Sequence, residues 1–226
     1  MAGKVTKKNT DLKTLADQAY VAIEEMIVDR RLEPGQMISE GEIGAKLRVG
    51  RTPIREAIAR LKSIGFVEIH NRRGVQVSVI DPIKHLELLE VRLPLELDVV
   101  RLAVKRASDT DLQELLAIAN SLVAAAKKGD RRAYFHAKRQ LHDIEVRSAR
   151  NSILSATMRT LHAQSRRFWQ SYEPTSSFEK GASFHQKIAQ AIIARNEAAA
   201  QNNVKKLFAF LESLTELVVR RRGREL

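Results

Sequence analysis

Near the N-terminus, apolar residues recur every three or four positions, the spacing that places them on one face of a helix. This spacing predicts a first helix from about residue 12 to residue 31, with these apolar positions: Leu15, Ala19, Ala22, Ile23, Met26 and Ile27. Pro34-Gly35 then predicts a turn. Ser39 is followed by Glu42 three residues later, and this pair can form a capping box. A second helix should therefore begin here and end near Leu47.

The next apolar stripe predicts a third helix, and two strands follow it. Thr52 is predicted to cap this helix, with Pro53 at its first position, where proline is well tolerated. Gly65 is predicted to end it. The apolar positions of the helix are Ile54, Ile58, Leu61 and Ile64. The two strands alternate apolar and polar residues over 66–69 and 75–79, and the loop 70–74 joins them. Three helices followed by a hairpin form a winged helix-turn-helix.

From Asp81-Pro82 onward the sequence is poor in glycine and proline and rich in strong helix formers. Because proline disfavours helix in the preceding residue, we place a domain boundary here. Six helices are expected, over about 83–106, 109–128, 130–149, 152–171, 178–195 and 197–221. Their predicted starts are Ser108 or Asp109, Asp130, Asn151 or Ser152, Ser176 or Ser177, and Asn196. Pro94 is expected to kink the first of them or interrupt its hydrogen bonds.

The predicted fold class is therefore mostly α, with an N-terminal winged helix-turn-helix and a C-terminal all-helical bundle. The expected domains are a disordered arm over 1–11, a winged domain over 12–80 and a helical domain over 83–226.

Composition narrows the functional classes. The apolar fraction of 44% is that of a globular protein, and the absence of cysteine excludes disulfides and thiolate chemistry. No apolar run approaches the ~20 residues that span a bilayer, and the N-terminus has no apolar signal region, so we expect a soluble, cytoplasmic protein with no membrane partner. The formal net charge of +12 suits a polyanionic partner.

The positive charge is concentrated around the third helix and the hairpin. Residues 46–73 hold eight basic residues against two acidic ones, Glu56 and Glu68. Arg51, Thr52 and Arg55 begin the helix, where an arginine can pair with guanine and threonine can meet phosphate. Arg72, Arg73 and Gly74 lie on the hairpin loop, which can reach a minor groove or its phosphates. The alternative is a solvated charged face.

These segments resemble the GntR family of bacterial transcription regulators. The resemblance covers Ser39-Glu-Gly-Glu-Ile43, Arg51-Thr-Pro-Ile-Arg-Glu-Ala-Ile58, Gly65-Phe-Val67 and Arg73-Gly74-Val75. It implies that Arg51 and Arg55 read operator bases, that Thr52 assists at the backbone and that Gly74 lies at the minor groove. One departure is Gly50, where the family usually has a serine that could contact phosphate; Arg48 is a candidate substitute as a charge.

Residues 83–226 resemble the FCD-type ligand-binding domain of the FadR-like branch of this family. The resemblance rests on Glu90-Val-Arg92 with Glu96, on Leu141-His142 with Asn151, and on Phe184-His185. Many members bind a divalent metal through one Asp and three His. Here the corresponding positions read Lys138, His142, His185 and Leu207. Asp143 should point away on its helix. With two of four ligands left, we expect no tightly bound metal, and His142 and His185 are only weak candidates.

A cationic set remains, formed by Arg92, Lys138, His142 and His185. If it converges inside the bundle, it suits a small organic acid, because arginine and lysine both bind carboxylates. The alternatives are that Arg92 only pairs with Glu96 at the surface, that Lys138 is exposed, and that both histidines are satisfied core residues.

The functional prediction is a homodimeric, sequence-specific transcription regulator, expected to be a repressor. Two winged domains would bind a palindromic operator in double-stranded DNA, and a small-molecule effector in the bundle would change operator affinity. The alternatives are a metal-responsive regulator of the same fold, an enzyme that uses His142 and His185, and a non-specific architectural DNA binder. The known catalytic motifs are absent, so the prediction is not an enzyme.

Overall fold

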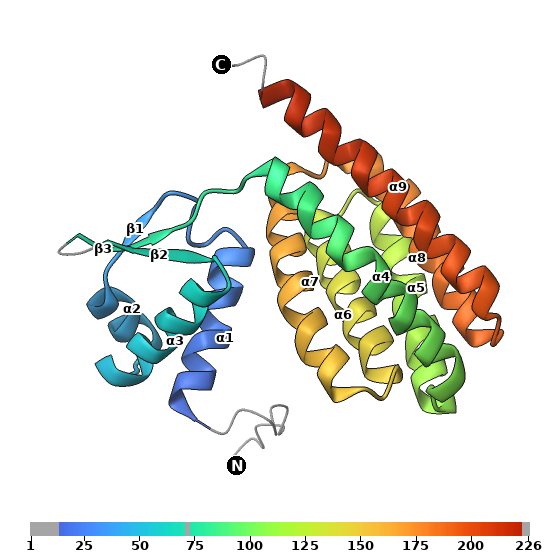
Figure 1. Cartoon of the computed structure of the whole chain (residues 1–226), viewed down its shortest axis with the longest axis horizontal. Coiled ribbons are helices and arrows are strands. Elements are labelled where there is room, and N and C mark those ends of the chain that lie inside the picture. The colour runs from blue at the N-terminus through green and yellow to red at the C-terminus, as the bar shows by residue number, and fades with distance from the viewer. Residues whose placement is uncertain (1–13, 71–72, 223–226) are drawn as a thin grey trace, which may run out of the picture. The chain divides into compact units, whose positions relative to one another are not determined.

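The computed structural model describes residues 14–70 and 73–222. The chain divides into two compact units, 1–80 and 81–226 (Figure 1). The first combines helices with a small sheet and the second is built of helices, so the predicted fold class is confirmed.

The first unit is a winged helix-turn-helix. Its elements are α1 (Leu15–Val28), β1 (Met37–Ile38), α2 (Glu40–Leu47), α3 (Arg51–Ser63), β2 (Val67–His70) and β3 (Gly74–Val77). The three strands form an antiparallel sheet in the order β1-β3-β2. The apolar stripes of α1 and α3 meet in its core, and their fully buried members include Ile23, Ile27, Ile54, Ile58 and Leu61.

Local signals set most of these boundaries. The capping box at the start of α2 is confirmed, since the Ser39 side chain accepts from the Glu42 N–H and the Glu42 carboxylate accepts from the Ser39 N–H. The predicted cap of α3 is wrong: the helix begins at Arg51, and Gly50 is its N-cap. The backbone carbonyl of Gly50 already accepts from the Ile54 N–H, so the first turn closes before Thr52. The short strand β1 was not predicted from the sequence.

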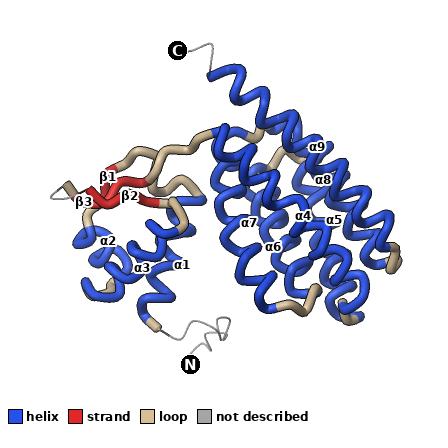
Figure 2. Tube along the Cα trace, viewed as in Figure 1, coloured by secondary structure: helices blue, strands red, loops and turns tan. Residues whose placement is uncertain are grey.

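The second unit is a bundle, and its described residues hold no strand (Figure 2). Its helices are α4 (Pro82–Arg106), α5 (Asp109–Lys127), α6 (Arg131–Ser148), α7 (Ser152–Tyr172), α8 (Phe178–Ile193) and α9 (Glu197–Arg222), with a short 3-10 helix at Thr175–Ser177. The predicted order of the helices is confirmed, and their bounds agree with the predicted ones within a few residues.

Side chains cap several helices of the bundle at the predicted positions. Ser108 forms a capping box with Asp111, and Asp130 and Asn151 cap α6 and α7 through their side chains. Ser177 precedes α8 without a side-chain bond, because the 3-10 turn already leads the chain into that helix. Pro94 lies inside α4, which continues as one helix from Pro82 to Arg106.

Candidate nucleic-acid interface and buried polar cluster

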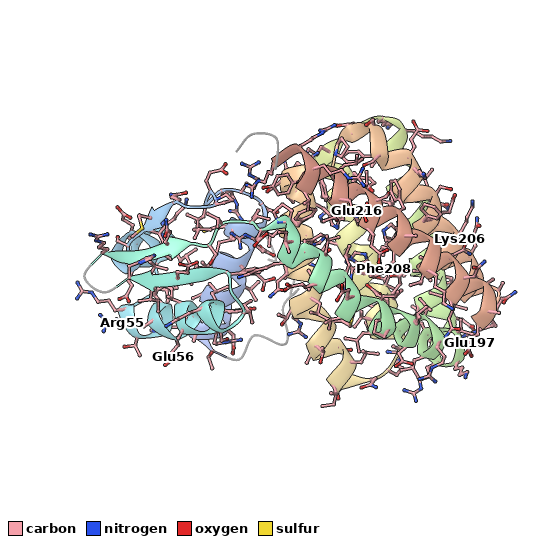
Figure 3. The ribbon with its side chains drawn as sticks, turned by 45° about the horizontal axis from the view of Figure 1, so that its top comes forward. Arg55, Glu56, Glu197, Lys206, Phe208 and Glu216 are labelled. Carbon is pink, nitrogen blue, oxygen red and sulfur yellow. The ribbon has the colours of Figure 1, made fainter. Side chains whose placement is uncertain are left out.

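The start of α3 presents basic side chains to solvent. Arg51, Thr52 and Arg55 are exposed, and the first turn of this helix holds no acidic residue (Figure 3 labels Arg55). The free N–H groups of a helix N-terminus and its partial positive charge favour an anion at this end. These side chains and N–H groups together form a surface suited to phosphates and base edges.

A tight turn brings α2 and α3 together. Arg48 ends α2 in the left-handed conformation, with φ 55°, and its side chain is exposed. A Cβ atom on Gly44 would lie 2.9 Å from the backbone oxygen of Val49, so this turn requires glycine at position 44. The turn places Arg48 next to the start of α3 along the chain.

The hairpin loop is described only in part. Arg73 is exposed, and its N–H donates to the carbonyl of His70 in the turn between β2 and β3. Arg72 lies outside the described residues. Gly74 has φ +99°, and a Cβ there would lie 3.1 Å from the backbone oxygen of Ile38. Close packing against β1 is therefore sufficient to explain this glycine without a DNA contact.

Two arginines of α3 pair with acidic residues from other helices. Arg55 Nε donates to Glu40 Oε2 at 2.7 Å, and Arg60 Nη1 donates to Asp17 Oδ1 at 2.8 Å. The guanidinium of Arg60 also lies 4.4 Å from the ring centre of Tyr20. Neither pair was predicted from the sequence, because each partner is many residues away.

In the bundle, Arg92 is the centre of a buried hydrogen-bond network. Its Nε and Nη2 donate to Glu96 Oε1 at 2.9 and 2.8 Å, and its Nη1 donates to Ser165 at 2.8 Å. The guanidinium also lies 5.2 Å from the ring centre of Phe208, which Figure 3 labels. The predicted i,i+4 pair of Arg92 and Glu96 therefore exists, but both residues are buried, so the surface alternative is wrong.

Lys138 is also buried, so the alternative of an exposed lysine is wrong as well. Its Nζ donates to Glu173 Oε2 at 3.0 Å, and the hydroxyl of Tyr134 donates to Glu173 Oε1 at 3.1 Å. Glu173 follows the last residue of α7, whereas Lys138 is in the middle of α6. The pair therefore links two helices at the interior of the bundle.

Three histidines meet between these two ion pairs. The ring centre of His142 lies 4.4 Å from that of His162 and 5.3 Å from that of His185. His162 Nε2 lies 2.7 Å from Glu96 Oε1, and because this carboxylate can only accept, the histidine donates the hydrogen bond. Among the described residues, no hydrogen-bond partner exists for either ring nitrogen of His142 or His185, nor for one oxygen of buried Glu145. The alternative of satisfied core histidines is therefore wrong for His142 and His185.

We call this group the buried polar cluster, and its members are Arg92, Glu96, Lys138, His142, Glu145, His162, Glu173 and His185. Sequence reasoning missed Glu145, His162 and Glu173 as members. A signal existed for His162, since Met158, His162, Ser165 and Trp169 recur at helical spacing and are all buried. No such signal existed for Glu173, which lies beyond the end of its helix.

Two small cavities border the cluster. Arg92, His142 and His185 line both of them. One cavity also contacts Lys138, Ser165 and Trp169, and the other contacts Glu96, Glu145 and apolar side chains that include Leu207. Each cavity has a volume of about 10 Å³ that the centre of a water molecule can occupy, so it holds roughly one water. A metabolite therefore requires side chains of the cluster to move apart.

Burial and neighbouring charges shift the pKa values in the cluster. Burial lowers the pKa of His185 to about 3, and the nearby charges of Lys138 and Arg92 add to this shift. Burial, with the charges of Arg92 and Lys138, also lowers the pKa of His142 well below its usual value. Burial alone would raise the pKa of Glu96, but His162 and Arg92 lower it to about 2. Burial and the charge of Glu96 raise the pKa of Glu145. The neutral form is thus favoured for His142, His185 and Glu145.

The positions expected from the family's metal site do not assemble a ligand set. Within the described residues, no group of three or more His, Cys, Asp or Glu side chains could hold a metal ion. Leu207 lines a cavity with an apolar side chain, and Lys138 carries an ammonium group. Asp143 is exposed, as expected from its position on the helix. His142 and His185 line one cavity together with Glu96 and Glu145, but these side chains do not form a metal-ligand set.

Comparisons with known proteins agree with this architecture. Residues 15–77 match the family of bacterial regulatory proteins known as the gntR family, and residues 87–210 match the FCD domain. A winged helix-turn-helix followed by a helical domain of this type defines a DNA-binding transcription regulator. The chain belongs to the GntR family and carries an FCD domain.

Individual relatives point the same way. The chain is 36% identical over 105 residues to the "Nta operon transcriptional regulator" of Aminobacter aminovorans, a match that covers 46% of this chain and 49% of the relative. It is 26% identical to the "Probable D-xylose utilization operon transcriptional repressor" of Paenarthrobacter nicotinovorans over 87% of each chain. The solved structure of E. coli McbR/YncC shares the fold, with a TM-score of 0.80 at 19% identity, over 91% of this chain and 99% of that one.

Within the part of the chain that the structure describes, no helix is both long enough and apolar enough to cross a bilayer.

Proposed function

We propose that this protein is a sequence-specific transcription regulator that reads operator DNA with the start of α3. The observation that carries the proposal is the exposed set of Arg51, Thr52 and Arg55 on a helix N-terminus without acidic residues in its first turn. In helix-turn-helix proteins the N-terminal end of the second helix of the motif, which is α3 here, enters the major groove. An arginine there pairs with guanine. Arg48, Arg73 and Gly74 would contribute contacts to the sugar-phosphate backbone.

The regulator acts as a homodimer on a palindromic operator in the cytoplasm. A two-fold protein reads two half-sites of a palindrome, and two weak half-site contacts then combine into one specific complex. The relative from Paenarthrobacter nicotinovorans is named a probable transcriptional repressor, which supports repression as the direction of control.

Selection of binding sites from random duplex DNA tests this function. We expect the wild-type protein to enrich a palindrome and to bind it at least ~10³-fold more tightly than scrambled duplex at physiological salt. Enrichment of no sequence, with a steep salt dependence for every duplex, would identify an architectural DNA binder instead.

The bundle binds a small organic acid that changes operator affinity. His142 and His185 each offer a ring N–H without an acceptor, and Lys138 and Arg92 make the potential at both rings positive. A carboxylate between these rings would accept both N–H bonds. Because Lys138 and Arg92 already pair with Glu173 and Glu96, the acid adds its charge to a balanced network and must compete with these carboxylates.

Titration calorimetry with short-chain carboxylic acids and their uncharged amides tests the effector class. We expect heat from at least one acid and none from its amide, and we expect His185→Ala to abolish the signal. The matched control is His136→Ala, which removes an exposed histidine from the same bundle and should leave binding unchanged. A native mass spectrum that shows a stoichiometric divalent metal instead would support the metal-responsive alternative.

A further inference from the structure

We propose that Glu40 is a positioning residue for Arg55, and that it raises the selectivity of DNA binding by orienting Arg55 toward a base and by weakening non-specific contacts. The observation is the ion pair between the first residue of α2 and the second turn of α3, in which Arg55 Nε donates to Glu40 Oε2 at 2.7 Å. This inference rests on the proposed reading of bases by α3. It adds an acidic residue to a surface formed by basic side chains.

The pair contributes little to folding stability. The side chain of Arg55 is 68% exposed and that of Glu40 is 34% exposed, and exposed ion pairs of this kind stabilise proteins only slightly. Glu40 also takes no part in the cap of α2, because Ser39 and Glu42 form that capping box by themselves. The consequence of the pair is therefore the orientation of the Arg55 guanidinium.

The atom that Glu40 binds determines which edge of Arg55 remains available. A guanidinium carries five N–H groups, one on Nε and four on the two Nη atoms. Glu40 accepts from Nε, and among the described residues neither Nη atom has a hydrogen-bond partner. The two Nη atoms form the outer edge of a planar group, and this two-pronged edge matches O6 and N7 of guanine. An arginine held through Nε is thus presented end-on with fewer rotamers to lose.

The charge of Glu40 has a second consequence. A carboxylate at the first turn of α2 is close to the surface that would face the phosphates, and it repels them. When Arg55 does not contact a guanine, no base contact offsets this repulsion. Such complexes with DNA are therefore weakened. Glu40 should therefore weaken non-specific binding more than it weakens specific binding.

Replacement of Glu40 tests both consequences on the operator selected by the wild-type protein. In Glu40→Ala, we expect discrimination at the one base pair that Arg55 reads to fall about tenfold, the lower end of the range for a two-pronged contact. We expect affinity for scrambled duplex to rise about threefold, since one negative charge is lost near the phosphates. Discrimination at the other base pairs should remain unchanged.

Two matched variants separate orientation from charge. Glu56→Gln removes one negative charge beside Arg55 on α3, where Figure 3 labels both residues, and it leaves the Glu40 pair intact. It should raise specific and non-specific affinity equally. Glu40→Gln keeps an oxygen that can accept from Arg55 Nε, so it should retain most of the base-pair discrimination while showing the same rise in non-specific affinity. Melting temperatures of all variants should equal that of the wild type.

Two results would overturn the inference: wild-type discrimination at every base pair in Glu40→Ala, or an equal effect in Glu40→Ala and Glu56→Gln. If Glu40→Ala misfolds, Glu40→Ser provides the same test, because serine has no carboxylate to pair with Arg55. In a background of Arg55→Ala, the change at Glu40 should have no further effect on base discrimination. Failure of the wild-type protein to select any sequence is a different result, because it contradicts the proposed function itself.

Discussion

The two units use charged side chains in opposite ways. In the winged unit, Arg51 and Arg55 are exposed, and Glu40, which pairs with Arg55, is itself partly exposed. In the bundle, Arg92 and Lys138 are 2% and 5% exposed, and each is paired with a buried carboxylate. Water solvates an exposed guanidinium, so this group needs no partner within the fold and is available to bind one outside the molecule. A buried cation has lost this solvation and requires a counter-charge within the fold.

Because of this contrast, the two sites should differ in how far they must rearrange before they bind a ligand. The winged unit offers its basic side chains without rearrangement, whereas the cavities of the bundle leave space for about one water each. Ligand binding in the bundle would thus require side chains of the buried polar cluster to move apart. Movement of this kind is what an effector needs in order to favour one arrangement of a regulator over another.

The largest effect is expected from loss of the exposed arginines. Arg51→Ala combined with Arg55→Ala should reduce operator affinity at least ~10³-fold, to the level of scrambled duplex, because the base contacts disappear. Fluorescence anisotropy with both duplexes measures this loss. The melting temperature should stay at the wild-type value, since both side chains are exposed. Retained selectivity in a folded double variant would show that other residues read the operator.

The next largest effect is expected from breaking a buried pair. Glu96→Ala leaves Arg92 buried without its carboxylate and should lower the free energy of unfolding by about 3–5 kcal/mol. Urea unfolding at a fixed protein concentration measures the change. The matched exposed pair is Arg30 with Glu33, and Glu33→Ala should cost less than about 1 kcal/mol. Similar losses in the two variants would remove the contrast between the units.

A third prediction concerns the pH dependence of the bundle. The pKa of His185 is about 3 in the folded state and about 6.5 in an unfolded chain, so the unfolded state binds a proton first as the pH falls. The stability present above pH 6.5 is lost between these two values, by about 2–3 kcal/mol from pH 6.5 to 4.5. His185→Gln should remove this part of the dependence in urea unfolding, whereas His136→Gln, at an exposed position, should keep it.

The smallest effect should be the same in both units. Ser39→Ala and Ser108→Ala each remove a side-chain cap and should each lower the free energy of unfolding by about 1 kcal/mol. Ser39→Thr keeps a hydroxyl at the cap and should recover most of the loss in the same denaturation assay. A much larger loss at Ser108 would mean that local caps are also coupled to the buried network of the bundle.

Local elements of both units were predictable from the sequence because their causes lie within a few residues. Capping at Ser39, Ser108, Asp130 and Asn151 depends on the next two or three N–H groups. Helical spacing then predicted the buried faces. The start of α3 was misplaced because Gly50 caps it through backbone conformation alone, and β1 was missed because two residues carry too little pattern.

The sequence by itself determined the winged helix-turn-helix, the helical bundle and the exposed basic start of α3, since each follows from short-range periodicity and composition. Only the tertiary structure decided which charges far apart in the sequence are paired. Glu40 lies 15 residues from Arg55, Glu173 lies 35 residues from Lys138, and Glu96 lies 66 residues from His162. Such pairs depend on how helices pack side by side, and burial sets their energy, so no local pattern in the chain specifies them.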